Sequence, residues 1–296
     1  MANTKLTNQD WRNESFPWSA PAKLNLFLHI TGRRADGYHL LQTLFHFIDF
    51  SDTLYFQVTK DSAITLSPSI ENVPDNENII IKAARLLQKT TGISSGAKIT
   101  LEKRLPMGGG LGGGSSDAAT TLLALNKLWG LNLPKTELMS LGLSLGADVP
   151  IFIHGQTAWA EGVGETLTNV PQSAINHKNW FLVIFPQINV NTGAIFSSSE
   201  LTRDKDPIRI RDFLNGTTEN VFEPLVAKQY PQIREALDWL NQFADARLTG
   251  TGACIFAGFK TEQKAREIAA QVPGKWQSFV AQGCYKTPAE KIYENQ

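Results

Sequence analysis

The sequence of 296 residues predicts an α+β fold, and the order of its local patterns carries this prediction. Segments that alternate like strands are interspersed with segments of helical periodicity. They do not form the long strand–helix–strand series that indicates a parallel sheet. We also find no internal repeat with a period of about 20 to 50 residues, which excludes solenoids and propellers. The chain length then favours one large or two modest domains.

The first half is expected to contain strands and three helices. Residues 22–30 alternate as in a half-buried strand, with Leu24 and Leu26 on one face and Lys23 and Asn25 on the other. Further strands are expected at residues 40–48, 53–58 and 98–101. Helices are expected at residues 76–87, from the N-cap candidates Ser115, Ser116 and Asp117 to Gly130, and from Leu138 to about Gly146.

The second half begins with an apolar strand at residues 180–185. A polar loop (201–212), helices (about 221–228, 232–243 and 261–272), a strand–glycine turn–strand unit (246–258) and a last strand (277–283) are expected to follow. The turn-rich segment 155–168 is the expected junction. We therefore predict an N-terminal domain at residues 1–165 and a C-terminal domain at residues 166–296.

Composition and charge narrow the class of protein. Lys+Arg and Asp+Glu both total 28, so no net field attracts nucleic acid or an anionic membrane, and an anionic ligand needs a local site. Cys254 and Cys284 lack metal-ligand spacing and indicate reduced thiols. Residues 1–18 lack the apolar run of a signal peptide, and no stretch is long enough to span a bilayer. We expect a cytoplasmic protein, monomeric or weakly homodimeric, without nucleic-acid or membrane partners.

A glycine-rich loop is the strongest local signal. Six of the seven residues from Gly108 to Gly114 are glycine, and they directly precede a predicted helix. Glycine permits positive φ and lets a ligand approach the backbone closely. Free N–H groups at a helix start also favour an anion there. A flexible linker is the alternative, but linkers do not usually join a strand to an amphipathic helix. The loop therefore predicts a phosphate-binding site.

The loop fits none of the common nucleotide motifs. Gly108, Gly110 and Gly113 satisfy G-x-G-x-x-G, but residues 126–135 lack the acidic residue that a dinucleotide site requires. No G-K-[ST] follows, as a Walker A loop requires, and no H-R-D or D-F-G follows, as a protein kinase requires. We expect phosphate binding by another scheme.

Three segments resemble the three motifs of the GHMP kinases, in the same order. They are PAKLNL at residues 21–26, PMGGGLGGGSSDAA at residues 106–119 and LTGTGACIFA at residues 248–257. The strings RADGYH (34–39), GADVP (146–150) and AEGVGE (160–165) further resemble the branch of this family that acts on a cytidine-diphosphate-linked methylerythritol. The resemblance covers nearly the whole chain.

The resemblance implies a two-domain GHMP-kinase fold with the active site in the interdomain cleft. It implies transfer of the γ-phosphate of ATP to the 2-hydroxyl of 4-diphosphocytidyl-2-C-methyl-D-erythritol, a step of non-mevalonate isoprenoid precursor biosynthesis. The catalytic pair that it implies is Asp148, as the base, with Lys23 reaching the hydroxyl and the γ-phosphate. Because an adjacent ammonium favours the ionised carboxylate, Asp148 is expected to orient the hydroxyl as much as to deprotonate it. Without the resemblance, Lys23 would be a surface lysine and Asp148 a turn aspartate.

The resemblance also implies the ligand contacts. The phosphates of ATP are assigned to Pro106, Met107, Gly108, Gly109, Gly110, Leu111, Gly112, Gly113, Gly114, Ser115 and Ser116. Asn78 and Lys103 are assigned to the adenosine side. For the acceptor, Tyr38 and Phe196 stack on the cytosine, His39 hydrogen-bonds it, and Asn25 and Thr192 contact the sugar or diphosphate. Taken alone, Tyr38 would be an ordinary loop aromatic and Phe196 a core residue.

Mg²⁺ is expected to accompany ATP, but the sequence assigns no metal ligand. Many GHMP kinases place serines directly after Gly-Leu-Gly, where this chain has Gly113 and Gly114. The other four histidines, His29, His46, His154 and His177, are scattered without metal spacing and receive no role.

Two alternatives stay open at this point. The first is another GHMP kinase, acting on homoserine, mevalonate or a sugar, which would have no use for an aromatic clamp of Tyr38, His39 and Phe196. The second is a catalytically silent nucleotide- or RNA-binding module. Neutral net charge disfavours RNA binding, and the presence of both Lys23 and Asp148 disfavours a silent module.

Overall fold

The computed structural model describes residues 10–71, 73–175, 179–214, 216 and 219–294. The strands are β1 (Trp18–Arg33), β2 (His39–Thr59), β3 (Ile64–Ser67), β4 (Gly96–Glu102), β5 (Ala158–Glu161), β6 (Thr166–Asn169), β7 (Trp180–Phe185), β8 (Ala246–Leu248), β9 (Ile255–Phe259) and β10 (Gln277–Cys284). The α-helices are α1 (Ile79–Thr91), α2 (Gly113–Leu128), α3 (Lys135–Leu145), α4 (Val149–His154), α5 (Thr192–Ser197), α6 (Ile210–Leu214), α7 (Glu223–Gln229), α8 (Pro231–Asn241), α9 (Glu262–Ala269) and α10 (Pro288–Glu294). Two short 3₁₀ helices lie at Asp10–Arg12 and Gln172–Ala174.

These strands form one ten-stranded sheet whose centre is β2. The main path runs β3-β4-β2-β10-β7-β9-β8, while β1 and the β5–β6 hairpin join β2 outside this path. All of the pairs are antiparallel except β3 with β4. Only Ile48 and Phe47 of β2 pair with Gly283 and Cys284 of β10, so this short ladder joins the two parts of the sheet. The α+β class is confirmed.

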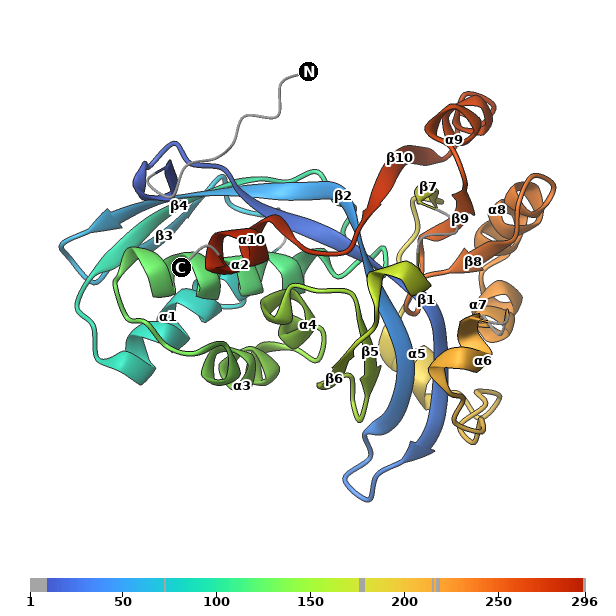
Figure 1. The fold of residues 1–296 in the computed structure, drawn as a ribbon, viewed down its shortest axis with the longest axis horizontal. Coiled ribbons are helices and arrows are strands. Elements are labelled where there is room, and N and C mark those ends of the chain that lie inside the picture. Colours follow the sequence, from blue (N-terminus) through green and yellow to red (C-terminus); the bar gives the residue numbers. More distant parts are fainter. Residues whose placement is uncertain (1–9, 72, 176–178, 215, 217–218, 295–296) are drawn as a thin grey trace.

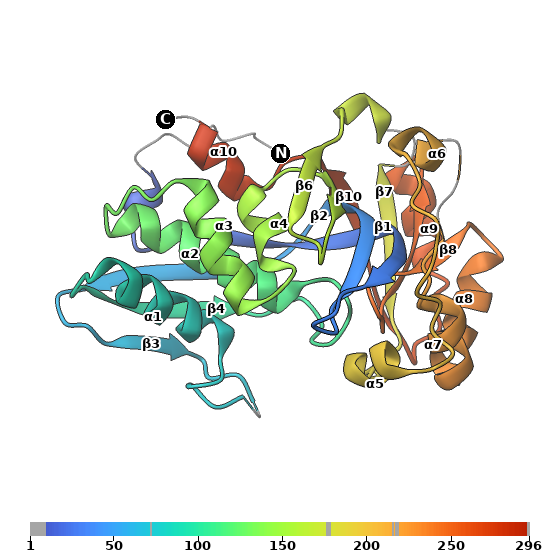
Figure 2. The ribbon, with the colours of Figure 1, turned by 90° about the horizontal axis from the view of Figure 1, so that it is seen from below.

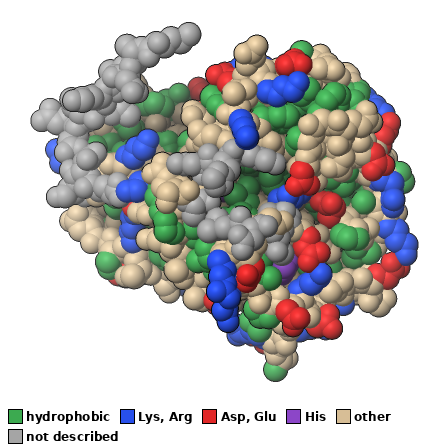
Figure 3. Space-filling view, turned by 45° about the vertical axis from the view of Figure 1, so that its right-hand side comes forward, with side chains coloured by type: hydrophobic (Ala, Val, Ile, Leu, Met, Phe, Trp, Pro, Cys, Tyr) green, Lys and Arg blue, Asp and Glu red, His purple; other side chains and the backbone are tan. Residues whose placement is uncertain are grey.

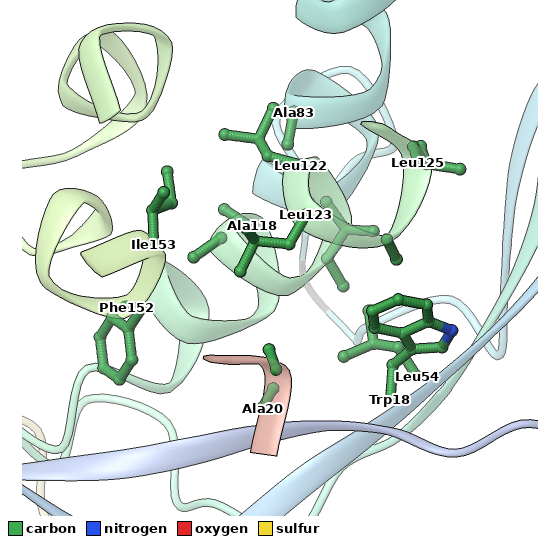
Figure 4. Close-up of a cluster of buried hydrophobic side chains, with 14 of the residues drawn as sticks. Trp18, Ala20, Leu54, Ala83, Ala118, Leu122, Leu123, Leu125, Phe152 and Ile153 are labelled. Carbon is green, nitrogen blue, oxygen red and sulfur yellow. The ribbon is translucent and has the colours of Figure 1, made fainter. Parts of the chain in front are cut away.

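Two groups of helices cover the two parts of the sheet (Figures 1 and 2). Helices α1 to α4 lie over the strands β1 to β4, and α7 to α9 lie beside β7 to β9. The first core packs α2 between α1, α4 and the sheet, and Leu122 of α2 lies near Ala83 of α1 (Figure 4). Ala20 of β1 and Phe152 of α4 belong to the same buried cluster. A second large cluster contains Ile184 of β7 and Leu237 of α8. The domain limits at residues 165 and 166 stay a prediction.

Helix α10 lies against α2, far from it in sequence. The Tyr293 hydroxyl donates to Leu123 O at 2.6 Å, and Lys127 Nζ donates to Ile292 O at 3.3 Å. Ala289 is buried in the same cluster as α2. A segment near residue 290 therefore completes the core built by the first strands and helices.

Two predictions about local structure were wrong. The segments 40–48 and 53–58 belong to one continuous strand, β2, because β4 pairs with the second of them and β1 pairs across both. The helix α2 begins at Gly113, with Gly112 as its N-cap, so Ser115, Ser116 and Asp117 do not cap it. Ser116 and Asp117 are instead buried inside the helix.

Helix α4 was not expected from the sequence. Its six residues follow Asp148 and begin with Val149-Pro150. A helix this short contains too few turns for a periodic pattern, but proline at the first helical turn is a favoured position.

None of the helices in the described ranges has both the length and the apolar character needed to cross a bilayer. On the face in Figure 3, positive and negative side chains are interspersed.

Candidate active site

A cavity of about 670 Å³ brings together most of the predicted site residues. The predicted residues that line it are Lys23, Asn25, Asn78, Lys103, Pro106, Met107, Gly108, Gly109, Gly110, Leu111, Gly112, Gly113, Gly114, Ser115, Asp148, Thr192 and Phe196. Tyr38, His39 and Ser116 do not belong to its lining. Residues from both ends of the sequence thus converge on one space, and their individual roles stay predictions.

The glycine loop takes its shape from contacts with the third glycine motif. Ala253 N donates to Gly108 O at 3.1 Å, and Cys254 N donates to Gly109 O at 3.0 Å. Gly110 has φ +73°, and a Cβ there would lie 2.2 Å from Thr249 O. Gly112 also has φ +73°, and a Cβ there would lie 2.7 Å from the Phe152 ring. The glycines at these positions are therefore required by the protein's own packing.

The end of the loop is open to the cavity. Gly114 is exposed, and a Cβ there would have only Ile79 Cγ2, at 3.8 Å, as a neighbour. It lies in the first turn of the 16-residue helix α2, whose leading N–H groups have no partner within the helix. These donors and the helix dipole make this end of the cavity suitable for an anion.

Lys23 and Asp148 meet beside the loop. Lys23 Nζ lies 3.3 Å from Asp148 Oδ2 and 2.6 Å from Asn25 Oδ1, which accepts a hydrogen bond from it. The Lys23 side chain is 3% exposed, and that of Asp148, at the N-terminus of α4, is 35% exposed. Lys23 N also donates to Leu111 O at 3.0 Å, which attaches β1 to the loop. The Phe45 ring faces the ammonium, with 5.4 Å from Nζ to its centroid.

A second lysine is held between two buried carboxylates. Lys103 Nζ donates to Asp52 Oδ2 at 2.6 Å and to Asp117 Oδ2 at 2.7 Å. Asp52 Oδ1 also accepts the backbone N–H groups of Arg104 and Leu105, at 2.6 and 2.8 Å. Asp52 thereby anchors the chain directly before the glycine loop.

Burial and neighbouring charges shift the pKa values of this group in opposite directions. Burial raises the pKa of Asp117 to about 7, although the Lys103 ammonium opposes that shift. Burial also disfavours the charge on Lys103, but Asp117 and Asp52 outweigh it, so the pKa of Lys103 is raised. Burial, aided by the nearby Asp52 carboxylate, therefore explains why the pKa of Asp117 lies near neutrality.

Two of the predicted acceptor residues, His39 and Phe196, contact Arg203. The rings of His39 and Phe196 are 5.0 Å apart, and Arg203 Nε donates to His39 Nε2 at 3.0 Å. Burial, followed by Arg203, lowers the pKa of His39, so the ring is neutral at pH 7. Because a guanidinium only donates, His39 carries its proton on Nδ1. Thr192 Oγ1 contacts Thr251 Oγ1 at 2.9 Å, whereas Tyr38 is 63% exposed.

The sequence did not identify three buried polar residues as site residues: Thr43, Asp52 and Asp117. Asp117 stood in the glycine motif but was read as a helix cap. Thr43 belongs to the part of β2 that is buried on both faces, where no alternation singles it out. Asp52 lies farther along β2, where burial alternates, and only its partners Lys103, Arg104 and Leu105 reveal its role. Thr249, in the predicted strand–glycine turn–strand unit, accepts a hydrogen bond from Asn25 N at 3.1 Å.

Comparison with known protein families agrees with this geometry. The profile described as "GHMP kinases N terminal domain" matches residues 78–156, and the profile "GHMP kinases C terminal" matches residues 198–278. A protein of Hahella chejuensis named 4-diphosphocytidyl-2-C-methyl-D-erythritol kinase is 51% identical, over 94% of this chain and 96% of its own. A protein of the same name from Ectopseudomonas mendocina is 55% identical, over 89% of each chain.

The chain belongs to the GHMP kinase family. This GHMP kinase is a small-molecule kinase, and ATP is its co-substrate. A crystal structure of 4-(cytidine 5'-diphospho)-2C-methyl-D-erythritol kinase is 30% identical, with a TM-score of 0.79 over 90% of this chain and 99% of the other. A mevalonate kinase structure, 17% identical, has a TM-score of 0.68 over 91% of this chain and 99% of its own, and shares the fold.

Proposed function

We propose that this GHMP kinase transfers the γ-phosphoryl group of ATP to the 2-hydroxyl of 4-diphosphocytidyl-2-C-methyl-D-erythritol. The proposal is supported by relatives of that name at 51% and 55% identity. The observation that carries it is the Lys23–Asp148 pair, 3.3 Å apart, beside a glycine loop and facing a common cavity.

We propose that the triphosphate lies along the glycine loop, with its γ-phosphate near Lys23. The main-chain N–H groups at the start of α2 would bind phosphate oxygens, and Lys103 and Asn78 would lie on the adenosine side. Asn78 already uses its Oδ1 to cap α1, accepting Ile80 N at 2.9 Å, so its free amide N–H groups would face the nucleotide. Catalysis then consists mainly of positioning and charge stabilisation, as is usual for phosphoryl transfer.

The reaction forms a bond between the acceptor oxygen and Pγ and breaks the bond from Pγ to the β,γ-bridging oxygen, so ADP leaves. We propose that Asp148 orients the 2-hydroxyl and takes its proton late in the transfer. Lys23 would neutralise charge on the transferred phosphoryl group. The Lys23 ammonium is pre-oriented for this by Asn25 and Asp148, without a large rearrangement.

Mg²⁺ would enter with ATP, because this ion usually uses phosphate oxygens, water and one or two carboxylates. Asp117 lines the cavity and has one oxygen, Oδ1, without a hydrogen-bond partner among the described residues, so the donor set fits. No cluster of three or more His, Cys, Asp and Glu side chains suited to a metal occurs in the described ranges, which agrees with an ion held largely by the nucleotide. When bound, the ion would neutralise phosphate charge.

For the acceptor, we propose that Phe196 and Tyr38 flank the cytosine ring and that His39 donates from Nδ1–H to its ring edge. Arg203 supports this because it engages the opposite nitrogen of His39. Thr192, which lines the cavity, would contact the diphosphate or sugar. The predictions of a cytoplasmic monomer or weak homodimer and of no nucleic-acid partner stay predictions.

A coupled assay of ADP release tests the function. Purified protein is given ATP, Mg²⁺ and one of four acceptors: the cytidine-diphosphate-linked methylerythritol, homoserine, mevalonate or galactose. We expect turnover with the first at least 10³-fold above the others, since a site that binds a base by stacking and hydrogen bonds rejects compounds lacking it. Faster turnover with another acceptor would replace the proposed substrate. No transfer to any of them would support a silent nucleotide-binding module.

A further inference from the structure

Three buried polar side chains lie in a row in the wall of the cavity. They are Lys23 and Asn25 of β1 and Thr43 of β2, with exposures of 3%, 2% and 0%. The register of β1 against β2 shifts between Asn25 and Leu28. At this irregularity the Thr43 hydroxyl donates to Phe27 O at 2.5 Å. Lys23 and Asn25 were expected from the sequence, but Thr43 was not.

The hydrogen-bond donors fix the direction of this row. A threonine hydroxyl has one proton, and that of Thr43 is used on Phe27 O, so toward Asn25 it presents only a lone pair. Asn25 Nδ2 donates to that lone pair at 3.0 Å. The amide oxygen, Oδ1, must then face the other way, where it accepts Lys23 Nζ at 2.6 Å. The reversed amide would place its NH₂ group against the ammonium, donor against donor.

We propose that Thr43 is a positioning residue for phosphoryl transfer, acting through Asn25 on the Lys23 ammonium. The inference rests on the function proposed above. Of the three Nζ protons of Lys23, one is directed to Asn25 Oδ1 and one toward Asp148 Oδ2, 3.3 Å away. Lys23 lines the cavity, so the third proton is available to a ligand bound there. A lysine side chain has four flexible bonds, and fixing its end before the reaction favours the transition state. Thr43 therefore fixes the position of the Lys23 ammonium group.

The surrounding contacts support a relay that ends at Lys23. Asn25 N donates to Thr249 Oγ1 at 3.1 Å, which holds the Asn25 backbone. The Thr249 hydroxyl lies 3.4 Å from both Asn25 Oδ1 and Gly110 O. Removing the Thr43 hydroxyl should therefore leave Asn25 Nδ2 without its acceptor and loosen the amide while the strand stays in place. The Lys23 ammonium group would then be less well positioned for the reaction.

The test compares Thr43→Val, which keeps the shape and removes the hydroxyl, with Thr43→Ser, which keeps the hydroxyl. The free energy lost by a buried amide without its acceptor is equivalent to a factor of about 5 to 150 in a rate. Because the proposal places this loss on the orientation of Lys23 in the transition state, we expect kcat of Thr43→Val to fall by up to roughly that factor. KM for ATP should stay unchanged, and Thr43→Ser should restore most of kcat. Thr121→Val is the matched control, since its buried hydroxyl donates only to Asp117 O within α2; its kcat should equal that of the wild type.

A double-mutant cycle separates positioning from a structural role. If Thr43 acts through Asn25, Thr43→Val should reduce kcat little further in an Asn25→Ala background, because the relay is already broken. Additive losses in kcat, or a Thr43→Val enzyme as active as wild type, would overturn the inference. If Thr43→Val does not fold in a urea titration, Thr43→Cys replaces it, since a thiol is a weak hydrogen-bond partner. A wild-type enzyme that does not phosphorylate the acceptor would instead refute the proposed function.

Discussion

The proposed nucleotide side and the proposed acceptor side of the cavity are built from different parts of the chain. On the nucleotide side, the main chain of residues 108–112 is fixed by hydrogen bonds to Ala253 and Cys254 and by the Phe152 ring. On the proposed acceptor side, the predicted contacts are side chains, of which Tyr38 and Thr192 are exposed, His39 and Phe196 are half-buried and only Asn25 is buried.

The proposed nucleotide site takes its shape from packing within the protein, whereas the proposed acceptor site is complete only when a ligand is bound. A main-chain site has its shape once the loop has folded, because backbone N–H groups have no rotamers. A site of aromatic side chains instead loses conformational entropy when it closes around a base. We therefore expect nucleotide binding to depend on the stability of the fold and acceptor binding to depend on single side chains.

The largest effect is expected at the junction of the two sides. Asp148→Asn keeps the size of the side chain and removes its charge and basicity. We expect kcat to fall by about 10²–10⁴-fold, the usual effect of losing a general base, with ATP affinity unchanged in calorimetry. Asp238→Asn, on the exposed face of α8, is the control and should have wild-type kcat. A kcat of Asp148→Asn near the wild-type value would mean that Asp148 is neither base nor orienting group.

Two glycine substitutions test whether the nucleotide side is set by packing. Gly112→Ala places a methyl group against the Phe152 ring at a left-handed φ, so we expect the free energy of unfolding to fall by about 2–5 kcal/mol. Gly114→Ala meets only Ile79 and should not destabilise the fold, because alanine favours a helix by about 1 kcal/mol over glycine. Its ATP affinity should nevertheless fall, since the methyl group crowds the phosphate. Urea unfolding and calorimetry measure the two quantities. Unchanged stability of Gly112→Ala would contradict the packing argument.

The seam between the two parts of the sheet should respond to pH. Complete burial lowers the pKa of His46 from 6.5 to about 4, and the ring lies against Gly283 of β10, with its Nδ1 bonded to Thr157 Oγ1. Because the folded state disfavours the protonated ring, this stability is fully present above pH 6.5 and is lost as the pH falls toward 4. The loss amounts to about 3 kcal/mol. In urea unfolding, His46→Asn should lack this contribution to the pH slope. An equal slope in both proteins would exclude His46 as its source.

The smallest expected effect is on the acceptor side. Tyr38→Ala should raise KM for the cytidine substrate and leave KM for ATP unchanged. The removal of one stacking partner of a base is worth about 1–3 kcal/mol, or roughly 5- to 150-fold in affinity. Phe243→Ala, an exposed aromatic outside the cavity lining, is the control. A larger rise in KM for ATP would reverse the two sides of the proposed site.

The sequence predicted the main-chain side better than the side-chain details. Glycines at fixed spacing before a helix are a local pattern, so residues 108–114 could be placed without knowing the fold. The start of α2 was misread, because Gly112 ends the loop by conformation while Ser115 to Asp117 only have the composition of a cap. Asp52 and Thr43 could not be found, since their partners lie 51 to 53 and 16 to 18 positions away and depend on how β2 pairs.

Helix α10 has a consequence for how this chain is made on the ribosome. Tyr293 contacts Leu123, 170 positions earlier, so α2 emerges long before the segment that covers it. At about 5–20 residues per second, translation of that interval takes roughly 10–30 s. During this time an apolar flank of α2 stays uncovered in the nascent polypeptide. Premature termination before residue 288 should therefore leave a protein that aggregates, although the missing residues lie outside the lining of the cavity.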